Sequence, residues 1–325
     1  MMRIVLLAGV AALALAACTT TEAAAPTAPA ATAAAAAAPA PPAATTPAPN
    51  TQPFARVVDL GQGVSMLIGQ GGNLGLSVGD DGVFLIDDQY ATNAVANLAK
   101  IEEHAKGKPK YLINTHWHFD HAGGNEVFGK AGATIFASDN VRKRLTGEVP
   151  SVSRGAPQVP APKIALPVVT FVEGIDFHLN GQTIRAIRAP LPAHTDGDTL
   201  IYFVEADVLH TGDTYMKDRY PFVDTGSGGT QAGFIAAIEK AVQIAGPNTK
   251  VIPGHGELAT EADLQAALDM HKGARAAVEA LVKSGKTLEQ AVAAKPLAQW
   301  TPRFGQGGFI SEDAYVTVIY NELKK

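Results

Sequence analysis

The residues most suited to chemistry lie in one short run that follows an apolar, strand-like stretch. Within six positions this run offers four possible metal ligands, which are His116, His118, Asp120 and His121. In an extended segment alternate side chains share a side, so the first three face one way and His121 reaches elsewhere. Two imidazoles can then hold one cation, while the carboxylate and the last imidazole take a second. This ligand set suits zinc, with iron or manganese as alternatives.

The run Thr-His-Trp-His-Phe-Asp-His resembles the His-x-His-x-Asp-His signature of the metallo-β-lactamase superfamily. The alternative is a polar loop without a metal, but three histidines and an aspartate at this spacing rarely serve only solubility. The resemblance implies an α/β fold of four layers, an αββα sandwich whose halves face each other across paired sheets. The pattern of strands and helices alone supports only a mixed α and β domain.

The resemblance also supplies three later ligand positions, which are His194, Asp213 and His255. Taken singly, each of the three could have an ordinary structural role, as an exposed loop residue or as a residue that forms a turn. As a set they imply a dinuclear site in which Asp213 and a hydroxide bridge the two metals. The implied ligands are His116, His118 and His194 for the first metal, and Asp120, His121 and His255 for the second.

The implied function is hydrolysis of an acyl compound: a β-lactam, lactone, ester or thioester. Two zinc ions about 3.5–4 Å apart can share a water and lower its pKa, so that the bridging hydroxide attacks the carbonyl. Asp120 orients the hydroxide, and Tyr215 is a candidate donor to substrate, with packing at a strand edge as its alternative. Many β-lactamases of the family have cysteine in place of Asp213 and a lysine three residues later, where this chain has Met216.

Two other functions remain open. An iron-dependent oxidoreductase of the same fold, such as a sulfur dioxygenase or a diiron enzyme, keeps similar ligands, and a metal assay separates it. A metal-binding lipoprotein without activity keeps the ligands but shows no turnover. Nucleic acid is excluded as a partner, because the formal net charge is -5 and no basic patch is present.

The first residues predict export and anchoring in a bacterial envelope. Residues 1–17 read as a signal peptide with Arg3 before an apolar core, and Cys18 follows a lipobox-like Leu-Ala-Ala. We expect Cys18 to be lipidated and to hold the protein on a membrane facing the periplasm, with a soluble periplasmic protein as the alternative. Residues 18–53 are almost entirely Ala, Pro and Thr, which predicts a linker without a folded core.

The domain that must position the ligands is predicted to span residues 54–325. It is expected to consist of two similar successive halves, each with strands first and helices later. The expected strands are 57–60, 64–68, 74–78, 83–86, 111–114, 134–137, 168–172, 176–179, 183–189, 200–204, 208–211 and 250–252, with Asn180-Gly181 as a hairpin turn. The expected helices are 91–106, 125–128, 139–145, one within 229–245, 261–282, 287–293 and 312–323. The proline-rich segment 150–167 is expected to form a wall of the active site.

The remaining histidines are not expected to bind metal. His104 and His271 are predicted to be solvated on helices, and His178 to lie in a hairpin. His210 is predicted to pack near the site or support a ligand. Trp117 and Phe119 are expected to pack beneath the metal loop, although one of them could face a substrate.

Overall fold

The computed structural model describes residues 52–153 and 156–325. The predicted signal peptide, Cys18 and nearly all of the predicted linker lie outside the described residues. Within the described part of the chain, no helix is both long and apolar enough to cross a membrane. The strands begin a few residues after the predicted linker.

The first sheet follows the predicted strands to within two residues at most ends. Its strands are β1 Arg56–Gly61, β2 Val64–Ile68, β3 Leu74–Gly79, β4 Gly82–Ile86, β5 Pro109–Ile113, β6 Thr134–Ser138 and β9 Val169–Phe171, in that spatial order. β1 to β4 pair antiparallel, which confirms the predicted meander. β4, β5, β6 and β9 then pair in parallel, so the ends of β4 and β5 meet at one edge of the sheet.

The second sheet carries the later candidate ligands at its strand ends. Its strands, in spatial order, are β10 Gly174–Leu179, β11 Gln182–Arg188, β12 Thr199–Phe203, β13 Val208–His210 and β14 Lys250–Ile252. The predicted hairpin is confirmed: Leu179 pairs with Gln182, and Asn180 and Gly181 have φ angles of 55° and 71°. Positive φ at both central residues is what a tight two-residue hairpin requires. β13 and β14 pair in parallel.

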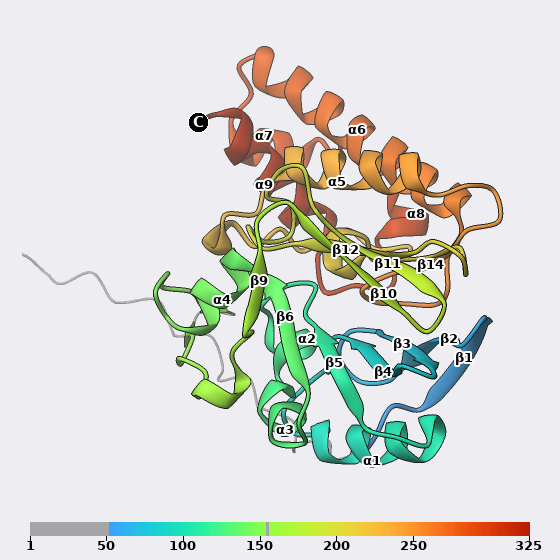
Figure 1. Ribbon diagram of the computed structural model, residues 1–325. Helices are drawn as coiled ribbons and strands as arrows, with labels where there is room; N and C mark the ends of the chain where they lie inside the picture. The colour runs from blue at the N-terminus through green and yellow to red at the C-terminus, as the bar shows by residue number, and fades with distance from the viewer. Residues whose placement is uncertain (1–51, 154–155) are drawn as a thin grey trace, which may run out of the picture. The chain divides into compact units, whose positions relative to one another are not determined.

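The two sheets pack face to face, and helices cover their outer faces (Figure 1). Alternation along the strands explains the layers, since neighbouring side chains point to opposite faces. In β5, Ile113 packs into the core between the sheets, while Leu112 packs against helices. In β12, Ile201 faces the other sheet and Leu200 faces helices. The predicted four-layer αββα sandwich is therefore confirmed.

The outer layers are made of amphipathic helices near the predicted positions. The first sheet is covered by α1 Ala94–Ala105, α3 Asn125–Lys130 and α4 Asp139–Leu145; the second by α5 Gln231–Ile244, α6 Glu261–Lys283, α7 Leu288–Ala293, α8 Thr301–Phe304 and α9 Glu312–Leu323. A capping box starts α6, because the Thr260 hydroxyl accepts from the backbone of Asp263 and the Asp263 carboxylate accepts in return. The short helix α8 was not predicted.

Candidate metal centre

The metal loop begins where β5 ends, beside the end of β4. The backbone of Thr115 donates to the Asp87 carboxylate at 2.7 Å, and its hydroxyl donates to the same carboxylate. The chain then bends from Thr115 to Trp117, and α2 begins at Phe119 and ends at Ala122. The predicted alternation through Asp120 is therefore wrong. Asp120 and His121 instead lie on one helical turn, which places both of them beside His255.

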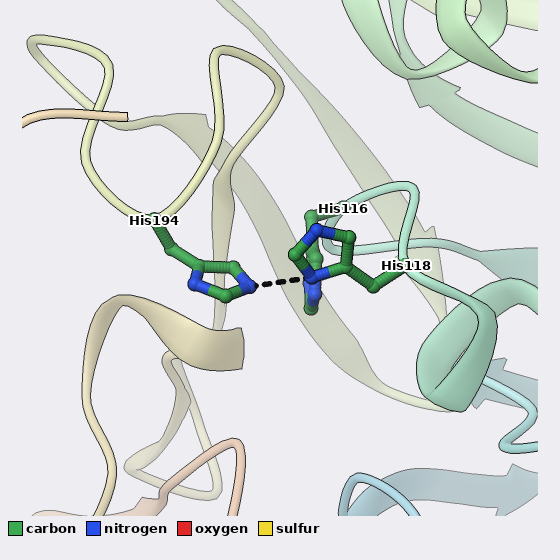
Figure 2. A group of neighbouring side chains, drawn as sticks. All are labelled: His116, His118 and His194. Atoms are coloured by element: carbon green, nitrogen blue, oxygen red, sulfur yellow. Dashed lines mark hydrogen bonds between the residues drawn. The ribbon is translucent and has the colours of Figure 1, made fainter. Parts of the chain in front are cut away.

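The first predicted group of ligands is assembled in the structure. Ligand atoms of His116, His118 and His194 all lie within 4.8 Å of one another (Figure 2). His194 Nε2 lies 2.7 Å from His118 Nδ1, although the two residues are 76 positions apart. His116 Nε2 is buried and has no hydrogen-bond partner among the described residues. A buried nitrogen of this kind is costly unless it binds something, and a cation at the centre of the three rings would satisfy it.

The second predicted group lies beside the first. Asp120, His121 and His255 offer ligand atoms within 4.8 Å of one another. The Nε2 atoms of His121 and His255 are 3.4 Å apart, and Asp120 Oδ2 is 3.4 Å from His255 Nε2. His121 is fully buried, whereas the side chains of His255 and Asp120 are 20% and 13% exposed. The second group therefore borders open space.

Asp213 lies between the two groups. Its carboxylate oxygens are 3.5 Å from His194 Nε2 in the first group, and 3.1 and 3.3 Å from the Nε2 atoms of His121 and His255 in the second. A short 3-10 turn, η2 Gly212–Thr214, delivers Asp213 after β13. Gly254 leaves room for it, because a Cβ there would come within 1.9 Å of Asp213 Oδ1. One carboxylate thus lies within reach of both ligand groups, and the bridging of two metals by Asp213 stays a prediction.

In four of the five candidate histidines, the ring nitrogen that faces away from the centre contacts an acceptor. Metal-binding histidines usually donate their second N–H in this way, which fixes the ring and its tautomer. The pairs are His116 Nδ1 with Thr115 Oγ1 at 3.0 Å, His118 Nε2 with Asp224 Oδ2 at 2.8 Å, His121 Nδ1 with Asp87 Oδ2 at 2.7 Å, and His194 Nδ1 with the Phe222 carbonyl at 2.7 Å.

The sequence analysis identified none of these acceptors, and two of them are carboxylates, those of Asp87 and Asp224. Asp87 had a readable signal, because it directly follows the apolar strand β4 as the metal loop follows β5. Asp224 had none, since it lies in a loop 106 positions from the histidine that it holds.

Burial and neighbouring charge leave His116 and His194 of the first group in the neutral form that binds a metal. Burial lowers the pKa of His194 to about 4, and the neighbouring imidazole of His118 adds to the effect. Burial also lowers the pKa of His116 well below its usual value, helped by His121. These rings are therefore neutral at pH 7, and a neutral imidazole is the form that binds a metal.

The second group shows the opposite balance. Burial is the largest single influence on His121 and His255 and lowers both pKa values, but carboxylates together outweigh it: Asp213 with Asp87 for His121, and Asp213 with Asp120 for His255. The pKa of His255 therefore rises to about 9 and that of His121 rises well above normal. Burial would raise the pKa of Asp120, yet its hydrogen bond to His255 and the charges of His121 and His255 together bring it down to about 2. When no ion is bound, protons on these histidines offset the negative charge of the carboxylates. The donor set thus fits a divalent cation, which replaces those protons.

A cavity of about 320 Å³ opens over the centre. The metal-centre residues Asp120, Asp213 and His255 line it, and Phe119 forms part of its apolar wall. Trp117 instead packs fully buried, and its indole donates to Ser227, so the two aromatic residues divide the predicted roles. The loop expected to form a wall does not do so: no described residue of 150–167 lines the cavity. That segment contains the small hairpin β7 Val152–Ser153 and β8 Ala156–Pro157 and the turn η1 Lys163–Ala165.

Tyr215 and His271 lie in surroundings that differ from the predicted ones. Tyr215 does not line the cavity; its side chain is 2% exposed and packs in the core beneath the helices, where burial raises its pKa. The packing alternative therefore describes it, and the role of substrate donor is wrong. His271 was predicted to be solvated, but it is buried between α5 and α9 and shares a hydrogen bond with the Tyr315 hydroxyl.

The other histidines lie as predicted. His104 and His178 are exposed. His210 is buried behind the centre, where Nε2 contacts the Asn73 carbonyl and Nδ1 accepts from the backbone of Gly212. Its role is thus to support the turn that carries Asp213.

The chain matches a known protein family and known relatives. The family described as "Metallo-beta-lactamase superfamily" matches residues 59–255, which include every candidate ligand. A hydroxyacylglutathione hydrolase of Brucella anthropi is 24% identical over 266 residues, covering 75% of this chain and 90% of that protein. A hydroxyacylglutathione hydrolase of Pelagibacter ubique is 24% identical over 148 residues, covering 41% of this chain and 53% of that protein. The chain thus spans only about half of the latter relative.

The fold also matches solved structures. A metallo-beta-lactamase from Pontibacter korlensis superposes with a TM-score of 0.54 at 21% sequence identity, covering 67% of this chain and 98% of that one. At this identity the likeness establishes the sandwich fold alone.

Proposed function

The chain belongs to the metallo-β-lactamase superfamily, and from that premise we propose that it is a dinuclear zinc hydrolase that cleaves an acyl bond. One observation carries the proposal. Asp213 lies within 3.5 Å of histidines from both ligand groups, so one carboxylate can serve two cations. Zinc suits the imidazole and carboxylate donors, and two nearby cations require such a bridge to offset their repulsion.

The side chains of the centre divide the work in the proposed reaction. Two bound cations supply a Lewis acid for the substrate carbonyl and lower the pKa of an attacking water. Asp120, which borders the cavity, is placed to orient that water. Asp87 and Asp224 hold the rings of His121 and His118, so the ligands need little rearrangement when a cation or substrate arrives.

The substrate is proposed to be a small acyl compound: a thioester, ester, lactone or β-lactam. Relatives named hydroxyacylglutathione hydrolases act on an acyl compound of glutathione, which supports acyl cleavage here. Met216 occupies the position at which many β-lactamases of the family have a lysine. Because that lysine is missing, β-lactams are less favoured as substrates than the other acyl compounds. A cavity of about 320 Å³ is at the small end of the range for ligand sites, roughly 300–1,000 Å³.

Metal content and a substrate panel test the proposal. The purified protein is expected to hold close to two zinc ions per chain, and zinc is expected to restore hydrolysis to the metal-free protein. Thioesters, esters, lactones and β-lactams are then compared at equal concentration. Recovery of an oxidation activity with iron but no hydrolysis with zinc would favour the oxidoreductase. Two bound zinc ions without turnover of any substrate would favour a metal-binding protein.

We also propose that the protein is a periplasm-facing lipoprotein held by Cys18. The support is the lipobox-like sequence before the single cysteine and the Ala, Pro and Thr linker after it. Cys18→Ser is expected to block processing or to move the protein out of the membrane fraction, and Thr19→Ser is the matched control. A Cys18→Ser variant that still fractionates with membranes would contradict the lipoprotein proposal and leave the hydrolase proposal intact.

A further inference from the structure

Two hollows on the surface meet at Arg219. The cavity over the metal centre is lined by Arg219 on one side, and a neighbouring groove of about 620 Å³ is lined by the same residue. Gly71 and His255 also border both hollows. A half-buried arginine therefore stands where a molecule that occupies the cavity would extend into the groove.

The other cations near this junction are already paired with protein carboxylates. Lys217 Nζ lies 3.4 Å from an oxygen of Asp263, and the Arg303 guanidinium is 2.6 Å from Asp218 and 2.8 Å from Asp263. Among the described residues, no carboxylate lies within ion-pair distance of Arg219, and no hydrogen bond of its guanidinium is found. Asp120 and Asp213, the carboxylates of the cavity lining, are engaged by histidines. A counter-charge for Arg219 must therefore come from a ligand or from solvent.

The backbone on both sides of Arg219 is fixed. The Lys217 amide donates to the His255 carbonyl at 3.1 Å, and the Tyr220 amide donates to the Phe304 carbonyl at 2.7 Å. Between them Asp218 adopts a left-handed φ of 54°, which few residues other than glycine do. The arginine is thus presented by a segment tied to the loop that carries His255 on one side and to α8 on the other.

The stem of Arg219 lies against glycines. A Cβ at Gly307 would lie 3.5 Å from its Nε, and one at Gly308 would lie 3.4 Å from its Cβ. Next to these glycines Phe309 is 70% exposed, and the centre of its ring lies 5.6 Å from that of Phe222, another residue of the cavity wall, with the two rings tilted by 53°. The cavity thus combines metal-centre residues at its base, an aromatic wall and a single unpaired guanidinium at its exit.

We propose that Arg219 binds a carboxylate of the substrate, and that the enzyme selects acyl compounds bearing such a group. The inference rests on the proposed hydrolase function and narrows its substrate class. A guanidinium presents parallel N–H donors that fit a carboxylate in two places, whereas an ammonium is a point charge. The substrate's acyl bond then lies at the metal centre, its apolar part contacts Phe222 and Phe309, and its carboxylate reaches Arg219.

Binding of two matched thiols to the zinc-loaded protein tests Arg219 without turnover. The probes are 3-mercaptopropionate and 3-mercaptopropanamide, which share a zinc-binding sulfur and differ in the carboxylate. Calorimetry on the wild type is expected to show the acid binding roughly ten- to a hundredfold more tightly, the gain of a charge-assisted hydrogen bond. In Arg219→Met the acid-to-amide affinity ratio is expected to fall to about one, and Arg219→Lys to retain part of it.

Lys217→Met is the matched control, because it removes the same charge two positions away from a side chain that is already paired. It is expected to keep the wild-type affinity ratio. A ratio near one in the wild type, or an unchanged ratio in Arg219→Met, would overturn the proposal. An equal fall in both variants would also overturn it, since it would indicate a general effect of charge.

Turnover separates this inference from the hydrolase proposal. The substrates are S-acetyl-3-mercaptopropionate and its methyl ester, and Arg219→Met is expected to lose the preference for the acid through KM rather than kcat. If neither thioester is hydrolysed but the acid-to-amide affinity ratio still depends on Arg219, the proposed thioester hydrolysis is contradicted and the proposed carboxylate site is supported. If both are hydrolysed equally well by the wild type, the hydrolase stands and the role of Arg219 is wrong.

Discussion

The protein buries histidines in two regions, and the two regions differ in what surrounds the rings. At the metal centre each ring is close to a carboxylate or to another imidazole, and outward-facing nitrogens are held by Asp87 and Asp224. In the helical layer His271 stacks on Phe234 at 5.7 Å and shares one hydrogen bond with Tyr315. No carboxylate acts on His271, and burial alone lowers its pKa to about 3.

This difference separates a ligand from a structural residue more clearly than burial does. His271 is as fully buried as four of the five histidines at the metal centre, so burial does not distinguish the two kinds. Where several imidazoles and carboxylates converge on one point, the carboxylates repel one another unless the imidazoles carry protons. A bound cation replaces those protons. A single neutral ring with one hydroxyl partner needs nothing more. Changes at the first region should therefore alter metal content and turnover, and changes at the second should alter stability.

Loss of Asp213 is expected to have the largest effect. Asp213→Ala removes the carboxylate shared by the two ligand groups, so the second metal should be lost first and most of the turnover with it. The fall in kcat/KM should exceed the roughly 10- to 100-fold typical of changing a residue that only supports a ligand. Metal analysis and steady-state rates measure both effects. Wild-type metal content and rates in this variant would rule out Asp213 as a ligand.

Asp213→Cys sharpens the same test. A thiolate binds zinc at about 2.3 Å but normally as a ligand to one ion, so this variant should keep the second zinc and lose the bridge. Its preference among acyl substrates is expected to shift, with β-lactam hydrolysis less damaged than lactone or ester hydrolysis. Equal loss of all activities, with two zinc ions retained, would contradict the expected shift.

His271→Ala is expected to change stability without changing the metal centre. It leaves a cavity beside Phe234 and an unpaired buried hydroxyl on Tyr315, at a combined cost of about 3 kcal/mol in the free energy of unfolding. Zinc content and kcat/KM of the folded protein should remain at wild-type values. His104→Ala, at an exposed position of α1, is the control and should stay within about 0.5 kcal/mol. A loss of zinc in His271→Ala would show that the two regions are coupled.

Asp87→Asn tests whether the carboxylates behind the rings matter. The variant keeps the shape of the side chain but removes the charge that His121 Nδ1 and the Thr115 hydroxyl contact. Zinc affinity is expected to fall roughly 10- to 100-fold with little change in the free energy of unfolding of the zinc-saturated protein. Asp176→Asn, which changes an exposed carboxylate of β10, is the matched control. Unchanged zinc affinity in Asp87→Asn would assign Asp87 a purely structural role.

The parts of the centre that could be predicted are those encoded locally. His116, His118, Asp120 and His121 lie within six positions, so their types and spacing are visible without a fold. The alternation inferred from that spacing was still wrong, because the chain turns into α2 after His118. Strand positions were predictable for the same local reason, since period-two patterns and glycine turns mark them.

The parts that could not be predicted depend on distant packing. Asp224 reaches His118 only because the loop before α5 lies over the metal loop. His271 was misplaced because one face of α6 is covered by both α5 and α9, and an isolated helix pattern does not reveal a second covering helix. Tyr215 lies two positions after Asp213, yet it leaves the 3-10 turn that carries Asp213 in an extended conformation, and its ring is buried in the core.

The smallest expected effect is the dependence of stability on pH that His271 contributes. The folded state holds its pKa at about 3, while the unfolded chain has the ordinary value near 6.5, so the unfolded state binds the extra proton as pH falls. The contribution is therefore complete above about pH 6.5 and is lost progressively as pH falls from there toward 3. Between pH 8 and pH 5.5 the loss amounts to about 1.4 kcal/mol, one pKa unit of linkage.

His271→Phe isolates this contribution, because the ring stays apolar and stacked on Phe234 but no longer titrates. Denaturant unfolding of both proteins at pH 8 and pH 5.5 gives the two losses of stability, and the other histidines contribute equally to each. The wild type should lose about 1.4 kcal/mol more than the variant over this interval. Equal losses would mean that His271 takes up a proton in the folded protein, so that it would resemble the carboxylate-paired histidines of the metal centre rather than a neutral structural ring.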